Sequence, residues 1–514
     1  MVNKLFARKP LKLLLAEMEG EHRLRRVLGP VQLTALGVGC IIGTGIFVLV
    51  GQAANQTAGP ALMVSFVVAG LCCVFSALCY AEFASMAPVA GSAFTYAYAT
   101  LGELFAWIIG WDLVLEYTVA SSAVAHGWSK YFQNLLVAFG IHFPNIVSTS
   151  PFDYHSAASG GPMQHLGPTG SFFDLPAILI VAAVTAILVL GIKQSAGFNA
   201  AMVILKLAVV AFVIAVGAFY VHPSNWRPFW PYGQWGVSLF GKTVLGWTDS
   251  SGAPVGMLAG AALIFFAYIG FDSVSTHAEE ARNPKRDVPI GIMVSLLLCT
   301  VLYIAVTAVL TGMVPYNKID VGAPVAQAFA QIGLPWAQKL IDVGAIAGIT
   351  SVLLVLMLSQ PRVLLAMARD GFLPTGFFGS VHARFRTPWK STIVTGIVVA
   401  VMAALLPLGI LAKLVNIGTL LAFVIVCLAV LVMRSTHPDA DRAFRCPWVP
   451  VTPILGIAFC LLLMFSLPSE NWLRLAVWLV IGLVIYFSYG RKNSVLARLR
   501  AEEEEKRLTE VAKG

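Results

Sequence analysis

Apolar segments long enough to cross a lipid bilayer recur along the whole 514-residue chain. Such a crossing needs about 20 apolar residues, and Val31–Ala54 supplies 24 without one charged side chain. Hydrophobic residues make up 58% of the chain and charged residues only 11%, unlike the average soluble protein. We predict an all-α membrane protein with twelve transmembrane helices, at roughly 31–53, 62–87, 94–121, 173–192, 198–221, 256–279, 288–314, 340–368, 391–407, 411–433, 450–467 and 472–490.

Lysine and arginine are divided unevenly between the two sides of these spans. With both termini in the cytoplasm, the inner loops and tails hold 26 of them and the outer loops hold seven. Positive charge favours cytoplasmic loops, so we expect both termini inside. The net charge of +9 then reflects topology and attraction to anionic lipid. Neither tail carries a recognisable nucleic-acid-binding module.

The spans divide the chain into four parts. Residues 1–30 form a basic cytoplasmic segment with no signal-peptide pattern, and the leucines of 5–15 predict an interfacial amphipathic helix. Residues 31–434 form the core, 450–490 hold spans 11 and 12, and 491–514 form a cytoplasmic tail. No polar stretch is long enough for a second domain. The longest, 122–172, predicts a short helix at 126–139. The eight cysteines have no metal-binding spacing, and we interpret them as packing residues.

Four glycines within Gly37–Gly45 interrupt the first span. The stretch matches a dinucleotide-binding pattern, but that pattern requires a soluble βαβ unit. Glycine disfavours a helix interior, and backbone groups freed inside a membrane need a ligand or a cavity. Opening near Ile41 would turn the N–H groups of Gly43, Thr44 and Gly45 into an anion cradle. The alternative is close helix packing through Gly39 and Gly43.

A second interruption lies in span 6, where Phe265–Ser273 brings a glycine, an acid and a hydroxyl into an apolar helix. Opening at 266–269 would expose carbonyl oxygens, which suit an ammonium group. An anion cradle opposite an ammonium cradle fits an α-amino acid. Phe266 and Tyr268 are candidates for an aromatic gate or for ordinary packing. We expect Asp272 to fix the break by accepting freed N–H groups.

The two interruptions open two groups of five spans, about 31–221 and 256–434. Because five is odd, the second group begins on the opposite side of the membrane and is inverted. Interrupted helices at matching positions of inverted halves indicate the central site of a transporter. Spans 11 and 12 lie outside this repeat.

Lys206 lies in Phe198–Val221, whose other side chains are nearly all apolar or small, roughly 12 Å from the inner end of the span. A charge at that depth normally faces the protein interior and has a function. We weigh three roles: a switch that gains and loses a proton, a fixed cation in place of a bound Na⁺, and a tie from span 5 to carbonyls of span 1.

Other polar side chains within the spans are weaker candidates. Asp112 and Glu116 lie four residues apart on one helical face, and one of them facing the site would favour a cationic substrate side chain. Thr350 and Ser351 line the site or bond back to their own helix. The charged run 279–287 forms a helix exit and turn, with a further role in inner ion pairs.

Five motifs resemble those of bacterial members of the cationic amino acid transporter family, in the amino acid–polyamine–organocation superfamily. They are Ile41–Phe47, Cys79–Phe83, Gly110–Tyr117, Phe265–Asp272 and Glu279–Pro284. The resemblance covers about residues 20–495. It implies the leucine-transporter-type fold, a five-plus-five inverted repeat with broken helices 1 and 6, plus two extra helices.

The resemblance also implies residue roles. It places a substrate carboxylate on the backbone of Ile41–Gly45 and the ammonium on the carbonyls of Phe266, Ala267 and Ile269. It makes Lys206 the proton-coupling residue, because relatives with a lysine here place its amine where sodium-coupled relatives hold Na⁺. Glu116 matches an acid implicated in contacting cationic side chains.

We therefore expect a secondary transporter of the bacterial inner membrane that imports cationic or small neutral amino acids by proton-coupled alternating access. The proton gradient is its energy source, without a cofactor, and a small accessory membrane subunit is compatible with the sequence. Alternatives are an amino acid or polyamine exchanger or uniporter, and an amino acid sensor. An enzyme is disfavoured because no catalytic motif lies in the spans, and a channel would need a continuous polar pore.

Overall fold

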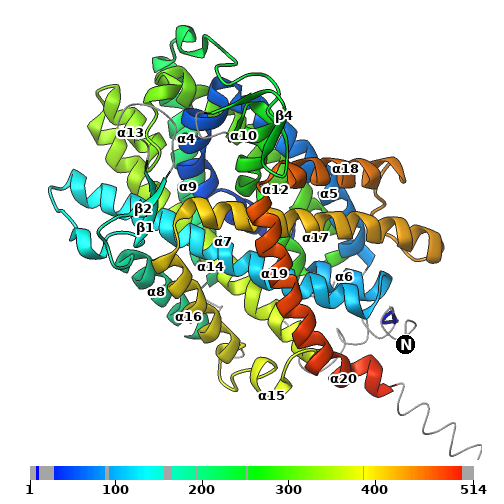
Figure 1. Cartoon of the computed structure of the whole chain (residues 1–514). Coiled ribbons are helices and arrows are strands. Elements are labelled where there is room, and N and C mark those ends of the chain that lie inside the picture. The colour runs from blue at the N-terminus through cyan, green and yellow to red at the C-terminus, as the bar shows by residue number, and fades with distance from the viewer. Residues whose placement is uncertain are drawn as a thin grey trace, which may run out of the picture.

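The computed structural model describes residues 7–10, 28–86, 92–155, 165–190, 195–249, 253–385 and 387–499 (Figure 1). Nearly all of the predicted amphipathic helix near the N-terminus lies outside these residues, as does the tail from residue 500. The described chain is mostly helical. Its helices are α3 (Pro30–Ile41), α4 (Val50–Ala53), α5 (Leu62–Met86), α6 (Ser92–Thr100), α7 (Glu103–Ala138), α8 (Leu175–Leu190), α9 (Ser195–Gly217), α10 (Met257–Ile264), α11 (Ser273–Thr276), α12 (Pro284–Met313), α13 (Pro324–Gln331), α14 (Pro335–Arg369), α15 (Thr375–Phe378), α16 (Trp389–Leu405), α17 (Leu408–Thr436), α18 (Val451–Ser466), α19 (Ser469–Ile485) and α20 (Arg491–Asn493).

Strands occur only as short antiparallel pairs in the described loops. They are β1 (Phe152–His155) with β2 (His165–Pro168), β3 (Val237–Leu239) with β4 (Lys242–Leu245), and β5 (Trp247–Thr248) with β6 (Pro254–Val255).

Eight stretches of the described chain are long and apolar enough to cross a membrane. Three shorter apolar helices, α8, α16 and α18, accompany them. The first of the eight, Pro30–Met86, contains two helical segments, α3–α4 and α5, with Gly59 at a φ of 61° between them. A mostly helical multi-span protein is therefore confirmed, and the count of twelve crossings stays a prediction.

The third span begins later and ends later than predicted. The prediction placed it at 94–121 with a separate helix at 126–139, but α6 ends at Thr100 and α7 runs unbroken from Glu103 to Ala138. Gly102, with a φ of 105°, allows the turn between α6 and α7. The polar residues that suggested a loop are paired inside the protein. Asp174 accepts the Ser129 hydroxyl at 2.6 Å, and its carboxylate lies 3.2 Å from His126.

Helices from both halves of the chain interleave in the core (Figure 1). The long helix α7 packs against α14 and α17, while α12 packs against α3 and α5. The two segments that the sequence marks as broken consequently meet in the middle of the molecule. All eight cysteines are free and buried, in keeping with packing residues.

Candidate binding site at the two helix breaks

The first break is present where the glycines predict it. Helix α3 ends at Ile41, and Ile42 has an extended ψ of 104° before helical geometry resumes at Thr44. A π-helical turn, Gly45–Leu49, follows. The first N–H groups of a resumed helix have no intrahelical acceptor, and here they belong to the Gly43–Gly45 region. The buried Thr44 hydroxyl beside them has no hydrogen-bond partner within the described chain.

The second break is also present. Helix α10 ends at Ile264, a 3₁₀ turn covers Phe265–Tyr268, and Gly270 takes a φ of 114° before α11 begins. Asp272 accepts the Tyr117 hydroxyl at 3.0 Å on one carboxylate oxygen, and its other carboxylate oxygen is buried without a hydrogen-bond partner in the described chain. The expected role of Asp272, accepting freed N–H groups at the break, stays a prediction.

The breaks pack directly against each other, and glycine makes this possible. A Cβ atom on Gly45 would lie 2.5 Å from Cβ of Ala267, and one on Gly270 would lie 2.5 Å from Sγ of Cys40. Both distances are well inside van der Waals contact. The four-glycine stretch therefore has two effects: it lets the first helix open, and it lets the first break pack closely against the second.

Tyr303 of α12 joins the two breaks, and the sequence prediction missed it. Its hydroxyl oxygen lies 2.7 Å from the carbonyl oxygen of Ile41 and 2.8 Å from that of Ala267. One phenol carries one proton, so it donates fully to only one of these carbonyls at a time. The available signal was a tyrosine hydroxyl in the middle of the span, but Ser295, Thr300 and Thr307 of the same span carry hydroxyls too.

The carbonyls predicted to bind an ammonium are partly engaged by the protein. The Phe266 carbonyl accepts the Ile269 N–H at 3.2 Å, and the Ala267 carbonyl faces Tyr303. A carbonyl oxygen has two lone pairs, so each retains capacity for a second donor. Their role in substrate binding stays a prediction.

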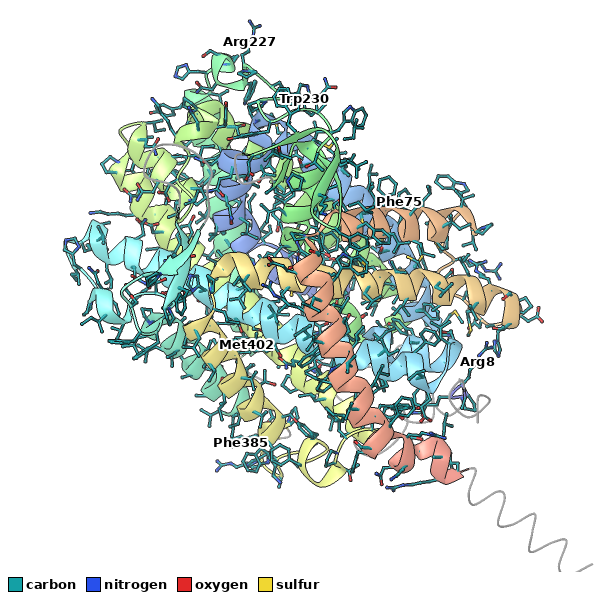
Figure 2. All side chains as sticks on the ribbon, in the orientation of Figure 1. Arg8, Phe75, Arg227, Trp230, Phe385 and Met402 are labelled. Carbon is teal, nitrogen blue, oxygen red and sulfur yellow. The ribbon has the colours of Figure 1, made fainter. Side chains whose placement is uncertain are left out.

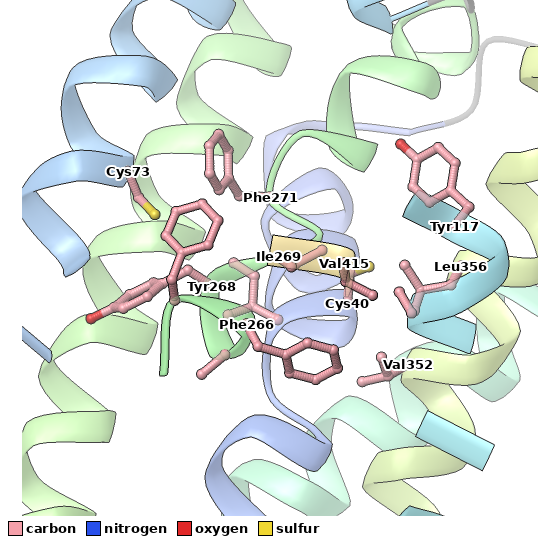
Figure 3. Packing of buried hydrophobic residues seen from close by; sticks show 14 of the residues in the cluster. Cys40, Cys73, Tyr117, Phe266, Tyr268, Ile269, Phe271, Val352, Leu356 and Val415 are labelled. Atoms are coloured by element: carbon pink, nitrogen blue, oxygen red, sulfur yellow. The ribbon is translucent and has the colours of Figure 1, made fainter. Parts of the chain in front are cut away.

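The two aromatic candidates point to opposite sides of the break (Figure 3). Phe266 lies toward Val352 of α14. Tyr268 lies on the side of α5, where its hydroxyl donates to the Phe66 carbonyl at 2.8 Å. Tyr268 therefore has a packing role, and Phe266 alone remains a candidate gate.

Apolar side chains from α14 and α17 lie next to the second break. Val352 and Leu356 of α14 and Val415 of α17 lie around Phe266 and Ile269 (Figure 3). All five are buried and belong to one continuous hydrophobic cluster. The sequence prediction named Phe266 and Ile269 for their carbonyls but named none of the three residues from α14 and α17.

Lys206 lies where its position in span 5 predicts, fully inside the protein. Its exposed fraction is 0%, and its Nζ atom donates to the carbonyls of Gly39 at 2.5 Å and Ile42 at 2.9 Å. These carbonyls are freed by the first break. The structure thus shows the tie between spans 5 and 1, and any change in the protonation of Lys206 would act on the break itself.

Asp112 and Glu116 lie together with Asp272 in one buried acidic group. Glu116 lies near enough to both other carboxyls for their charges to interact with it, and Asp112 lies against Gly418. No ion pair in the described part of the chain involves any of the three acids. Contact between Glu116 and a substrate stays a prediction.

Thr350 is engaged away from the breaks. Its hydroxyl donates to the Ile346 carbonyl of its own helix at 2.7 Å and accepts the indole N–H of Trp128 at 2.9 Å. Ser351 is buried beside it. For Thr350 the back-bonding alternative describes the observed contacts.

An ion pair closes the side of the breaks that leads toward the termini. Arg362 of α14 donates to Glu280 at 2.6 Å, and another of its nitrogens lies 3.1 Å from Nε2 of His277. His277 Nδ1 bonds the Ser273 carbonyl, which can only accept, so Nε2 accepts from Arg362. The predicted ion pairing of the 279–287 run is present in this contact, and its place on the inner side of the membrane stays a prediction.

Breaking this pair should open that side of the protein. In Arg362→Gln, Glu280 loses its partner, and removing one member of a buried pair costs about 3–5 kcal/mol. We expect Cys40, now buried beside Gly270, to react faster with a membrane-impermeant maleimide applied from that side. Lys285→Gln, which breaks the exposed 2.7 Å pair with Asp441, should change nothing. Equal Cys40 labelling in both variants would contradict the gating role.

The opposite side of the breaks is also covered. The Tyr131 hydroxyl donates to the Phe47 carbonyl at 2.6 Å. Gln327 of α13 donates to Asn134 at 2.8 Å, and Asn134 donates in turn to Asp342 at 2.8 Å. Helix α13 is thereby tied to α7 and α14, so the breaks are enclosed from both sides.

Comparison with known proteins identifies the family of this chain. A family profile described as amino acid permease matches residues 28–487. The chain belongs to the amino acid permease family. This membership, within the amino acid–polyamine–organocation superfamily, implies the leucine-transporter-type fold, and it identifies a multi-pass transporter of amino acids rather than an enzyme.

Relatives of this permease differ in what their names say they carry. It is 49% identical to the branched-chain amino acid permease BcaP of Bacillus subtilis, over 96% of this chain and all of that protein. It is 47% identical to the methylthioribose transporter of the same organism, with the same coverage. Identity to the vacuolar cationic amino acid transporter 4 of Arabidopsis thaliana is 32%, over 96% of this chain and 97% of that protein.

Proposed function

We propose that this permease imports neutral amino acids with branched apolar side chains, driven by protons, across the bacterial cytoplasmic membrane. The proposal departs from the expectation of cationic and/or small neutral substrates, because branched side chains are neutral but larger. The observation that carries it is the apolar group of Val352, Leu356 and Val415 beside Phe266 and Ile269 (Figure 3). A hydrocarbon side chain buried there leaves water without leaving a charge unpaired.

In this proposal the backbone of the breaks holds the part shared by all amino acids. The N–H groups at Gly43–Gly45 and the Thr44 hydroxyl receive the carboxylate, as helix N-termini receive anions. The carbonyls of Phe266, Ala267 and Ile269 receive the ammonium. The apolar group then selects the side chain. The name of the branched-chain relative with 49% identity supports this selection.

Lys206 couples the cycle to protons. When protonated, it can donate to the Gly39 and Ile42 carbonyls and hold the first break to α9. When neutral, it carries no charge to stabilise those contacts, so α3 is released for opening toward the cytoplasm. Alternating access then breaks these two sets of contacts in turn. The contact of Arg362 with Glu280 is lost in one state, and the contacts of α13 with α7 and α14 are lost in the other. Both termini lie in the cytoplasm, and twelve helices cross the membrane.

The second candidate is import of cationic amino acids, and the unpaired acids Asp112, Glu116 and Asp272 favour it. An arginine or lysine side chain reaching Glu116 would supply the missing positive partner. Proteoliposomes with an inward proton gradient separate the two. If the permease imports amino acids with branched apolar side chains, it takes up leucine, isoleucine and valine, and Glu116→Gln leaves leucine uptake intact. Preference for arginine, lost in Glu116→Gln, would establish the second candidate instead.

Leu356→Ala should weaken leucine binding selectively. Removing the Leu356 side chain costs about 2 kcal/mol of apolar contact with the substrate. Because 1.4 kcal/mol is tenfold in affinity, we expect KM for leucine to rise at least about tenfold. The KM for alanine as a substrate should stay unchanged, because its side chain is too short to reach residue 356. Parallel uptake measurements with both substrates test this, and an equal change for both would contradict a role in selection.

A further inference from the structure

The loop between α9 and α10 carries a hairpin with unusual exposure. Strands β3 and β4 are joined by Phe240 and Gly241, which take positive φ values of 52° and 78°. Apolar side chains project from the hairpin and its flanks, each between 43% and 67% exposed: Trp235, Leu239, Phe240, Val244, Leu245 and Trp247. Adjacent strand residues point to opposite faces, so the neighbours Val244 and Leu245 make both faces of β4 apolar.

The hairpin is fixed to the turn between α18 and α19. The Phe240 N–H donates to the Phe465 carbonyl at 2.8 Å, and the Ser469 N–H donates back to the Phe240 carbonyl at 3.2 Å. The ring of Phe240 packs edge-on against Phe465 and Trp472, with centroids 5.6 and 5.4 Å away. Figure 1 shows β4 beside α10 and the end of α18.

That turn lies at a membrane surface. Helices α18 and α19 are apolar, and their 16 and 17 residues span about 25 Å at 1.5 Å per residue, close to the bilayer core thickness. Only Leu467 and Pro468 separate them. Two such helices joined so tightly must turn at the boundary between hydrocarbon and headgroups. Helix α19 contacts the hairpin through Trp472 at its start, and it exposes the apolar side chains of Leu473 and Val477.

We propose that the β3–β4 hairpin, with Trp235 and Trp247, is a lipid anchor that inserts into the leaflet boundary beside α19. Trp side chains favour this zone because one edge is apolar and the other donates a hydrogen bond. Lys242, exposed at the start of β4, supplies a cation for lipid phosphates. We expect the bilayer to cover the hairpin, because the apolar surface of the hairpin continues the lipid-facing surface of α19.

The anchor is connected to the broken span 6. The Leu258 N–H at the start of α10 donates to the Trp235 carbonyl at 2.9 Å, and Gly256 N–H donates to Thr57 at 2.8 Å. Gly236, Gly246 and Gly256 meet at the base of the loop, where a Cβ atom on Gly256 would lie 2.9 Å from the Gly236 nitrogen. The outer end of α10 is thereby held at a fixed depth. This inference does not depend on which substrate is carried.

Spin labelling of the full chain tests the anchor. A nitroxide at Val244→Cys is measured in vesicles of equal parts phosphatidylethanolamine and phosphatidylglycerol, with collision rates for oxygen and for a water-soluble nickel chelate. Gln331→Cys, at the end of α13 and exposed on the loops, is the aqueous control. Val477→Cys on α19 is the lipid control. Wild-type protein, with its cysteines all buried, sets the background.

We expect the oxygen-to-nickel collision ratio at Val244 to exceed that at Gln331 and to approach that at Val477. A ratio at Val244 equal to that at Gln331 would place the hairpin in water and overturn the proposal. A label shielded from both reagents, with spin–spin broadening that grows with protein density, would show a second copy of the chain as the occupant and overturn it as well.

Discussion

Replacing Lys206 with methionine is expected to abolish proton-driven accumulation of substrate while the protein still folds. Methionine matches the length of the lysine stem but cannot bind a proton. The carbonyls of Gly39 and Ile42 would lose their donor, at about 1–3 kcal/mol for each unsatisfied group. Since these carbonyls belong to the first break, the loss falls on the element that must move, and the driving proton loses its binding site.

The size of the effect follows from the energy in the gradient. One pH unit is worth 1.36 kcal/mol per proton, which supports about tenfold accumulation when one proton accompanies each substrate. Wild-type proteoliposomes with a gradient of one unit should therefore approach about tenfold accumulation. The Lys206→Met variant should reach only equal concentrations inside and outside.

Two controls separate coupling from damage. Lys318→Met removes an exposed lysine from a loop and should behave as wild type. Counterflow of labelled substrate, which needs no gradient, should persist in Lys206→Met at a reduced rate. Accumulation equal to wild type in Lys206→Met would refute proton coupling through this residue.

The parts of the site that the sequence predicts well are those marked by local energetics. Glycines in Gly37–Gly45 disfavour a helix wherever they occur, so the first break is visible without tertiary structure. A lysine deep in an apolar span must face the interior, so Lys206 could be placed. Neither argument identifies a partner, and the contacts of Lys206 with Gly39 and Ile42 emerge only when α9 packs on α3.

The parts that the sequence could not predict depend on which face of a helix is used. An amphipathic helix shows its buried side through periodicity, but α14 and α17 are apolar around most of their circumference. Val352, Leu356 and Val415 therefore look like every other apolar residue in those helices. The role of Tyr303 could not be predicted either, because its hydroxyl contacts two breaks that are far apart in the sequence. The start of span 3 was misplaced because 92–100 is as apolar and aromatic as the helix that follows Gly102.

Gly45→Ala should abolish transport by forcing the two breaks apart. The new Cβ atom would lie 2.5 Å from Cβ of Ala267, with the Ala267 Cα in contact as well. Backbone atoms cannot rotate away, so the two breaks must separate. Overpacking of this kind costs about 1–3 kcal/mol, and the displaced N–H groups would no longer be aligned for a carboxylate. Gly376→Ala, with no atom within 4 Å, is the matched control.

The neighbouring Gly43 separates steric crowding at the site from general damage to the fold. A Cβ atom on Gly43 would lie 2.5 Å from Cγ2 of Val352, which is a side-chain atom and can be removed. Gly43→Ala should therefore lose uptake and regain much of it when combined with Val352→Ala. The same Val352→Ala change should not rescue Gly45→Ala, because that clash is with backbone. Initial uptake rates, normalised to folded protein recovered, measure both pairs. Rescue of both glycine variants, or of neither, would show that the breaks are not packed as described, and wild-type uptake by Gly45→Ala would show that their close approach is unnecessary for transport.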